Sequence, residues 1–323
     1  MIPFPIEKYT TNSGLAVYVL RCRMYRSMVG RVHVIPDLKT VIDTGSEDVQ
    51  SRQDILAGFD ELNRSFGVAI RPDEITRVLL THSHVDHLGG TPLFTQPNVE
   101  RCLNVNDVPM AENPQKYFAD ALVNLQRFFD LTKTPPGQQP RLRQAFLGMG
   151  PRTVGYTIQR PLRDGDQVGP FTVHETPGHT KGQSVFQLDE ALFTGDHILS
   201  QTMAPIWPKV FSPLMGFENY FHGLDKVGKL VKSGVTTAFL PSHEQTIVEP
   251  QRRIDMIRAA QQRRFQKICQ ILNISDVDSV RGTRLIAHGY ELAQKIYVAP
   301  TDFFAYVGLL DIGARLEYLS ERN

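Results

Sequence analysis

Residues 81–90 of the chain read THSHVDHLGG and carry four potential metal ligands within six positions. They follow Val78-Leu79-Leu80, a short apolar run that predicts a buried strand. The two glycines that end the stretch allow the backbone to turn tightly. Imidazole and carboxylate ligands together suit Zn²⁺, Mn²⁺ or iron. A polar loop with hydrogen-bonded histidines is the alternative, but the His-x-His-x-Asp-His spacing favours a metal site.

Four ligands so close in sequence cannot all point at one tetrahedral ion, so two neighbouring metal ions are the easier geometry. The motif resembles the signature of the metallo-β-lactamase-fold hydrolases. Three further motifs similar to those of that family follow in the expected order: TPGHTKG (176–182), LFTGD (192–196) and PSH (241–243). The resemblance covers residues 41–243. It implies an α/β fold, a four-layer αββα sandwich, which we expect over residues 1–249.

The resemblance also implies seven metal ligands distributed over two ions. His82, His84 and His179 are assigned to one ion, Asp86, His87 and His243 to the other, and Asp196 joins the two. Asp86 and Asp196 are the catalytic candidates, because they balance the metal charge and fix the position of the nucleophile. Mixed His and Asp ligation favours two Zn²⁺ ions, with Mn²⁺ or iron as alternatives.

Composition places the chain among ordinary globular proteins. Of its 323 residues, 41% are hydrophobic and 21% are charged, and a formal net charge of +1 gives no global attraction for nucleic acid or membrane. The three cysteines, Cys22, Cys102 and Cys269, are widely spaced and indicate neither a disulfide framework nor a Cys-x-x-Cys metal site. The N-terminus lacks a signal-peptide pattern, and no apolar run reaches transmembrane length. We therefore expect a cytoplasmic protein without a membrane partner; the sequence does not indicate its oligomeric state.

Residues 109–161 are the least typical part of the expected sandwich and predict a helical insertion. An apolar stripe at helical spacing runs from Tyr117 to Phe129 and includes Phe128. One interpretation is a lid in which Phe128, Phe129 and Phe146 face the substrate. The other is a helix that packs on the core, since apolar stripes usually indicate burial.

The loop after Asp196 should lie at the mouth of the metal site. We therefore expect His197 and Trp207, together with Phe128 of the insertion, to contact the substrate. A tryptophan anchored in the core is the competing interpretation for Trp207. Asp43 follows a predicted strand and either lies beside the metal site, as in the resembled family, or caps a turn.

Residues 250–323 change in character and predict a helical appendage. Its first helix alternates apolar residues with Arg252, Arg253, Arg258, Arg263, Arg264 and Lys267. Residues 314–319 resemble the last helix of a small winged-helix-like unit in the branch that includes endoribonucleases similar to lactamase-β-like proteins. The basic helix is either a local contact for nucleic acid or an ordinary solvated face.

Two neighbouring metal ions can hold a bridging hydroxide near neutral pH, and that hydroxide would attack a carbonyl carbon or a phosphorus. The first interpretation is a metal-dependent hydrolase of a small ester, thioester or lactone, similar to glyoxalase II, with a small molecule as its partner. The alternative is a nuclease, an endoribonuclease-like phosphodiesterase with the same dinuclear site. An inactive metal-bearing scaffold is the third, and the complete ligand set disfavours it. The balanced charge and the aromatic insertion favour the small molecule.

Overall fold

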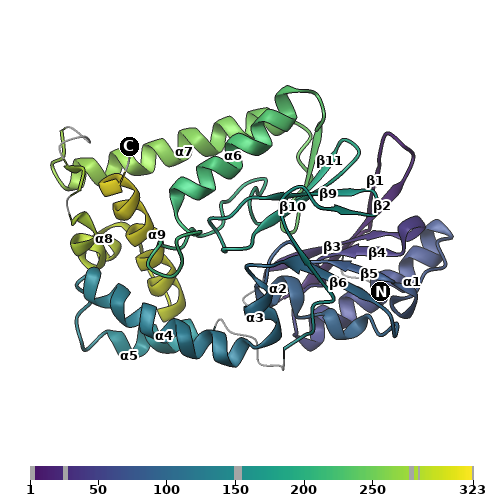
Figure 1. The fold of residues 1–323 in the computed structure, drawn as a ribbon, viewed down its shortest axis with the longest axis horizontal. Helices are drawn as coiled ribbons and strands as arrows, with labels where there is room; N and C mark the ends of the chain where they lie inside the picture. The colour runs from purple at the N-terminus through teal and green to yellow at the C-terminus, as the bar shows by residue number, and fades with distance from the viewer. Residues whose placement is uncertain (1–3, 25–27, 149–154, 276–279, 283, 322–323) are drawn as a thin grey trace.

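The computed structural model describes residues 4–24, 28–148, 155–275, 280–282 and 284–321. Two mixed β-sheets face each other, with helices on their outer sides (Figure 1). The first sheet runs in sequence order: β1 Glu7–Thr10, β2 Ala16–Arg23, β3 Val29–Ile35, β4 Thr40–Ile42, β5 Arg77–Leu79, β6 Glu100–Asn104 and β7 Arg160–Leu162. The second has the spatial order β12 Ala238–Pro241, β11 Ala191–Gly195, β10 Ser184–Leu188, β9 Phe171–Glu175 and β8 Gln167–Val168.

The core between the sheets follows from the alternation of side chains along each strand. Phe186 on β10 and Phe193 on β11 are paired in register, and both are buried between the sheets. Their neighbours Val185 and Leu192 face the other way and belong to the core beneath the helices. These strands are therefore buried on both faces, which explains why they read as continuous apolar runs.

Helices cover the outer face of each sheet. The first sheet carries α1 (Val49–Phe66), which packs Phe59 and Leu62 against it. The second sheet is covered by α6 (Phe217–Lys232) and α7 (Pro250–Ile271) (Figure 1). The short elements of the sandwich are α2 Val85–Leu88 and 3-10 turns at Pro36–Leu38, Pro72–Glu74 and Thr91–Leu93. A further 3-10 turn, Leu285–His288, lies in the C-terminal region. The predicted α/β sandwich followed by helices is confirmed.

Four helices of the insertion and the C-terminal region share one hydrophobic core with α6 and α7: α4 Pro114–Leu131, α5 Gln139–Leu147, α8 Gly289–Ile296 and α9 Asp302–Glu321. The short helix α3 (Val108–Glu112) packs Ala111 into the core of the first sheet instead. The contact of α9 with α4 is close, because a Cβ on Gly313 would stand 2.5 Å from the Phe128 ring. No described helix has the length and apolarity to cross a membrane.

Glu249 is the N-cap of α7. Where the structure describes the chain beyond Glu249, it forms helices and no strand, so no β-wing accompanies them. Residues 149–154 of the predicted insertion lie outside the described residues, as do 276–279, 283 and 322–323 of the predicted appendage.

Candidate metal centre

The seven predicted ligands meet because each follows the end of a strand. The cluster of residues 82–87 follows β5, whereas His179 follows β9, Asp196 follows β11 and His243 follows β12. These strands belong to two different sheets, so the ligands gather where the sheets face each other. His84 is the N-cap of the short helix α2, which turns Asp86 and His87 back toward the same point.

The ligand atoms form three groups of three, two outer groups and one that shares a residue with each of them. His82, His84 and His179 make one group and Asp86, His87 and His243 another, with the ligand atoms of each within 4.8 Å of one another. His82, His87 and Asp196 form a third group between them. The structure thus brings together the two ligand sets that the sequence predicts.

Asp196 lies between the two groups with one oxygen toward each. Its Oδ2 is 3.6 Å from His179 Nε2, and its Oδ1 is 3.5 Å from both His87 Nε2 and His243 Nε2. Asp86 Oδ2 is also 3.5 Å from His243 Nε2, on the second side alone. A carboxylate in the position of Asp196 can join two cations, whereas Asp86 can serve one.

Hydrogen bonds behind the imidazoles fix their orientation. His179 donates from Nδ1 to the Pro205 carbonyl at 2.7 Å, and His243 donates from Nδ1 to the Val29 carbonyl at 2.9 Å. Carbonyl oxygens only accept, so both rings carry the proton on Nδ1 and present Nε2 to the centre. His87 Nδ1 is 2.8 Å from Asp43 Oδ2, which orients that ring in the same way.

Asp43 therefore lies beside the metal centre, as in the first of its two interpretations. It sits at a left-handed φ of 55° directly after β4 and is almost fully buried. Besides His87, its carboxylate accepts from the Thr81 backbone N–H at 2.8 Å and from the hydroxyls of Thr81 and Ser242. It ties the loop after β5 to the loop after β12.

Several ligand atoms are buried and have no hydrogen-bond partner among the described residues. They include His87 Nε2, His179 Nε2 and Asp196 Oδ1. A buried polar atom without a partner costs about 1–3 kcal/mol, and folded proteins rarely keep several at one point without a ligand. Neutral imidazole nitrogens and carboxylate oxygens are the donors that Zn²⁺, Mn²⁺ and Fe²⁺ accept. The residues present therefore fit two divalent cations.

The electrostatics suit metal ligation. Burial lowers the pKa of His84 to about 3, so its ring is neutral. Burial also lowers the pKa of His243, but the carboxylates of Asp196 and Asp86 outweigh it and raise the value to about 9. Burial raises the pKa of Asp196, yet the charges of His243 and His87 hold it well below its usual range. A divalent cation would displace the protons that this arrangement otherwise attracts.

Sequence reasoning missed Asp107, which joins two ligand loops. Its buried carboxylate accepts from the Ser83 N–H at 2.9 Å, between His82 and His84. It also accepts from the Thr180 hydroxyl at 2.9 Å and the Gly182 N–H at 2.8 Å, beside His179. The available signal was a carboxylate three residues after β6, the strand next to β5.

A cavity of about 380 Å³ opens on the His84 side of the centre. Trp207 lines it, as do Tyr117 and Phe118 from the first half of α4 and Phe146 from α5. The second half of α4 packs Phe128 and Phe129 into the core, as the second interpretation of the insertion expects. Of the three side chains named for a lid, Phe146 alone lines the cavity.

The other two predicted substrate contacts do not line this cavity. The Phe128 side chain is fully buried against Gly313 of α9. His197 is buried against Tyr220 and Gly223 of α6, behind the loop that carries His179. Of the three predicted substrate contacts, the structure places Trp207 alone in the cavity wall.

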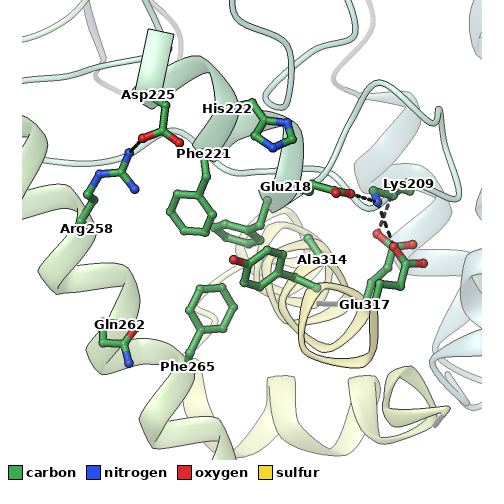
Figure 2. Close-up of a pocket in the computed structure, with 13 residues that line it drawn as sticks. Lys209, Glu218, Phe221, His222, Asp225, Arg258, Gln262, Phe265, Ala314 and Glu317 are labelled. Atoms are coloured by element: carbon green, nitrogen blue, oxygen red, sulfur yellow. Dashed lines mark hydrogen bonds and ion pairs between the residues drawn. The ribbon is translucent and has the colours of Figure 1, made fainter. Parts of the chain in front are cut away.

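A second cavity, of about 440 Å³, lies between α6, α7 and α9 and contains no residue of the metal centre (Figure 2). Its floor is aromatic, with Phe217, Phe221 and Phe265 among the lining residues. Lys209 Nζ lies 2.6 Å from a Glu218 oxygen, and Arg258 pairs with Asp225 (Figure 2). The charged groups of this cavity thus largely neutralise one another.

The family profile described as the metallo-beta-lactamase superfamily matches residues 32–243, which span the whole ligand set. Three solved structures, all under 25% identical, share the fold. A metallo-beta-lactamase family protein from Thermus thermophilus has 22% identity and a TM-score of 0.69, over 94% of this chain and 92% of that one. A beta-lactamase domain protein from Burkholderia ambifaria has 17% identity and a TM-score of 0.60, over 99% and 88%.

The third structure is BJP-1, a subclass B3 metallo-beta-lactamase of Bradyrhizobium japonicum, with 16% identity and a TM-score of 0.53 over 84% of this chain and 97% of that one. No functionally curated protein matches the sequence. The matched profile covers well over half of the chain, and the His/Asp cluster lies within it. The chain therefore belongs to the metallo-beta-lactamase superfamily and carries the His/Asp metal-binding cluster of a metallohydrolase.

Proposed function

We propose that the protein hydrolyses small carboxyl esters, thioesters or lactones with two bound divalent cations, Zn²⁺ being the first candidate and Mn²⁺ or iron the alternatives. The observation that carries this proposal is the cavity of about 380 Å³ beside His84. Its volume suits a small molecule, and its wall combines a group of aromatic and apolar side chains with polar and charged ones, so that a ligand could be both buried and oriented there. An acyl group there would place its carbonyl at the His/Asp cluster.

The cations would supply Lewis acidity and a water nucleophile of lowered pKa. The chain's own contribution is to hold and shield the reacting group. Asp196 and Asp86 provide the negative charge of the centre, and the hydrogen bonds of His179 and His243 fix the rings that face it. The aromatic wall with Phe146 and Trp207 excludes water from the acyl group.

The nuclease alternative has less support from the geometry. Arg253 of α7 is buried and donates to the Leu199 carbonyl at 2.6 Å, so it is a structural residue. Arg252 pairs with Glu249, and Arg258 pairs with Asp225. None of the basic residues of α7 lines the cavity beside the metal centre.

A substrate panel at fixed metal concentration tests the proposal. It contains aryl esters, acyl thioesters, lactones, a phosphodiester and a short single-stranded RNA. We expect turnover of carboxyl substrates, unaffected when the exposed Arg263, Arg264 and Lys267 are all changed to Gln. RNA cleavage that weakens steeply with salt and is lost in the triple variant would establish the nuclease instead.

A further inference from the structure

Lys181 lies on the wall of the cavity beside the metal centre, two residues after His179. Its Nζ is 4.9 Å from the centre of the Tyr117 ring, which also lines the cavity. Among the described residues, no carboxylate lies within the 4.0 Å of an ion pair with this ammonium group. The Tyr117 ring face attracts the cation and keeps it at the cavity wall.

Asp107, an acidic residue of the same cavity wall, does not neutralise Lys181 by direct contact. Asp107 uses both carboxylate oxygens to accept hydrogen bonds from Ser83, Thr180 and Gly182. Lys116, the other lysine on this cavity, is already paired with Asp120 at 2.6 Å, and both of these side chains are mostly exposed. Lys181 is thus the cationic group of the cavity wall that remains available to a ligand.

The cavity wall is polar next to the metal centre, where His84, Thr180 and Lys181 line it, and Glu112, Lys116 and Asp120 are its other charged groups besides Asp107. The apolar part is closed by aromatic rings, with Trp207 5.1 Å from Phe211 and 6.3 Å from Phe146. A ligand that satisfies both parts combines an apolar body with a negative charge.

We propose that Lys181 binds a carboxylate on the substrate, so that the protein acts on anionic acyl esters or thioesters with a short apolar chain. This rests on the proposed hydrolase function. One lysine without a carboxylate partner, and no arginine among the residues that line the cavity, match a monoanionic carboxylate better than a phosphate, which usually gathers several cationic donors. The apolar chain between this carboxylate and the scissile carbonyl would then lie against the aromatic rings, and the carbonyl would face His84.

Binding can be measured without turnover, because Trp207 is the only tryptophan of the chain and lines this cavity. Hexanoate and its neutral isostere hexanamide are titrated against the metal-loaded protein, with Trp207 fluorescence as the readout. We expect hexanoate to bind about tenfold more tightly, the size of one charge-assisted contact. In Lys181→Gln the two ligands should bind equally, and Lys181→Arg should retain the preference.

The matched control is Lys116→Gln, which removes a lysine on the same cavity that already has a carboxylate partner. It should keep the preference for hexanoate. If Lys181→Gln also keeps it, the carboxylate is held elsewhere, for instance by the metal ions, and the proposal is overturned. Equal binding of the two ligands by the unchanged protein overturns it as well.

A kinetic pair distinguishes this proposal from the hydrolase itself. The esters 4-nitrophenyl hydrogen glutarate and 4-nitrophenyl valerate have acyl chains of equal length and differ by one carboxylate. We expect the anionic ester to have a KM about tenfold lower, and this ratio to fall to about one in Lys181→Gln. If neither ester is hydrolysed, the proposed function fails, while the hexanoate titration still decides the role of Lys181.

Discussion

The cavity beside the metal centre and the cavity between α6, α7 and α9 have similar volumes, about 380 and 440 Å³. The two regions differ in whether their polar and charged groups have partners. In the cavity between the three helices, the helical cavity, Lys209 contacts Glu218 and Arg258 contacts Asp225 (Figure 2). Lys209 also contacts Glu321. Beside the metal centre, buried ligand atoms have no hydrogen-bond partner among the described residues. Cavity volume therefore does not identify the reactive site, whereas several unsatisfied ligand atoms gathered at one point do.

The largest expected effect comes from Asp196→Ala, which removes the carboxylate between the two ligand groups. The metal content after mild dialysis should fall below that of the unchanged protein. Hydrolysis should drop by more than the ~100-fold typical of residues that only hydrogen-bond a ligand. Elemental analysis and initial rates measure both. Asp225→Ala in the helical cavity is the matched control and should retain full metal content; a fully active Asp196→Ala protein would contradict the metal assignment.

A smaller effect is expected from Asp107→Asn. The new amide can accept hydrogen bonds through one atom only, and its NH₂ group faces at least one of the donors on Ser83, Thr180 and Gly182. We expect a loss of about 2–3 kcal/mol in the free energy of unfolding and a 10–100-fold loss in metal affinity. Urea unfolding and competition with a chelator measure the two.

The comparison for this variant is Asp225→Asn, whose exposed ion pair with Arg258 should contribute no more than about 1 kcal/mol. If both variants lose the same stability and neither loses metal affinity, Asp107 has no special role at the metal centre. The difference between the two cavities would then not include Asp107.

The smallest effect concerns Glu317, a group of the helical cavity whose pKa is clearly raised. Burial raises this pKa from 4.5 to about 7, while the hydrogen bond from the Lys209 N–H opposes the change. Above pH 4.5 the unfolded chain releases this proton and the folded chain keeps it, so stability falls as the pH rises toward 7 and levels off beyond it. The shift corresponds to an upper limit of about 3 kcal/mol, and solvent screening reduces it to about 2.

Glu317→Gln should therefore be more stable than the unchanged protein at pH 8 and equally stable at pH 4, as measured by chemical unfolding at both values. Glu218→Gln serves as the control, because contact with Lys209 lowers the pKa of Glu218. It should not gain stability at pH 8. An equal gain in both variants would attribute the effect to the total charge of the cavity.

The metal ligands and the sandwich could be predicted from the sequence because short local patterns specify them. Residues 81–90 place four ligands in one loop, and the apolar runs at β10 and β11 define buried strands. The cavity wall could not be predicted in the same way. The periodicity of α4 identifies its apolar face, but only the packing of α9 decides that Phe128 joins the core and Phe118 faces the cavity.

The roles of Asp107 and Arg253 could not be predicted from the sequence for a related reason. The hydrogen-bond partners of Asp107 come from two loops that are distant in sequence. The residues next to Asp107 in the sequence do not indicate that its carboxylate joins these loops. Arg253 belongs to a basic helix by composition, yet it is buried and bound to the carbonyls of Leu199 and Thr202. Composition reports charge, whereas burial depends on tertiary neighbours.

The close contact of Gly313 with Phe128 has a consequence for biosynthesis. Every residue of the metal centre precedes α9 in the chain, so all seven leave the ribosome before α9, which begins at Asp302. The nascent chain can therefore assemble its ligand cluster before α4 acquires the neighbour that holds it in place. During that interval the cavity wall is incomplete, so metal can be loaded before the chain is able to select a substrate.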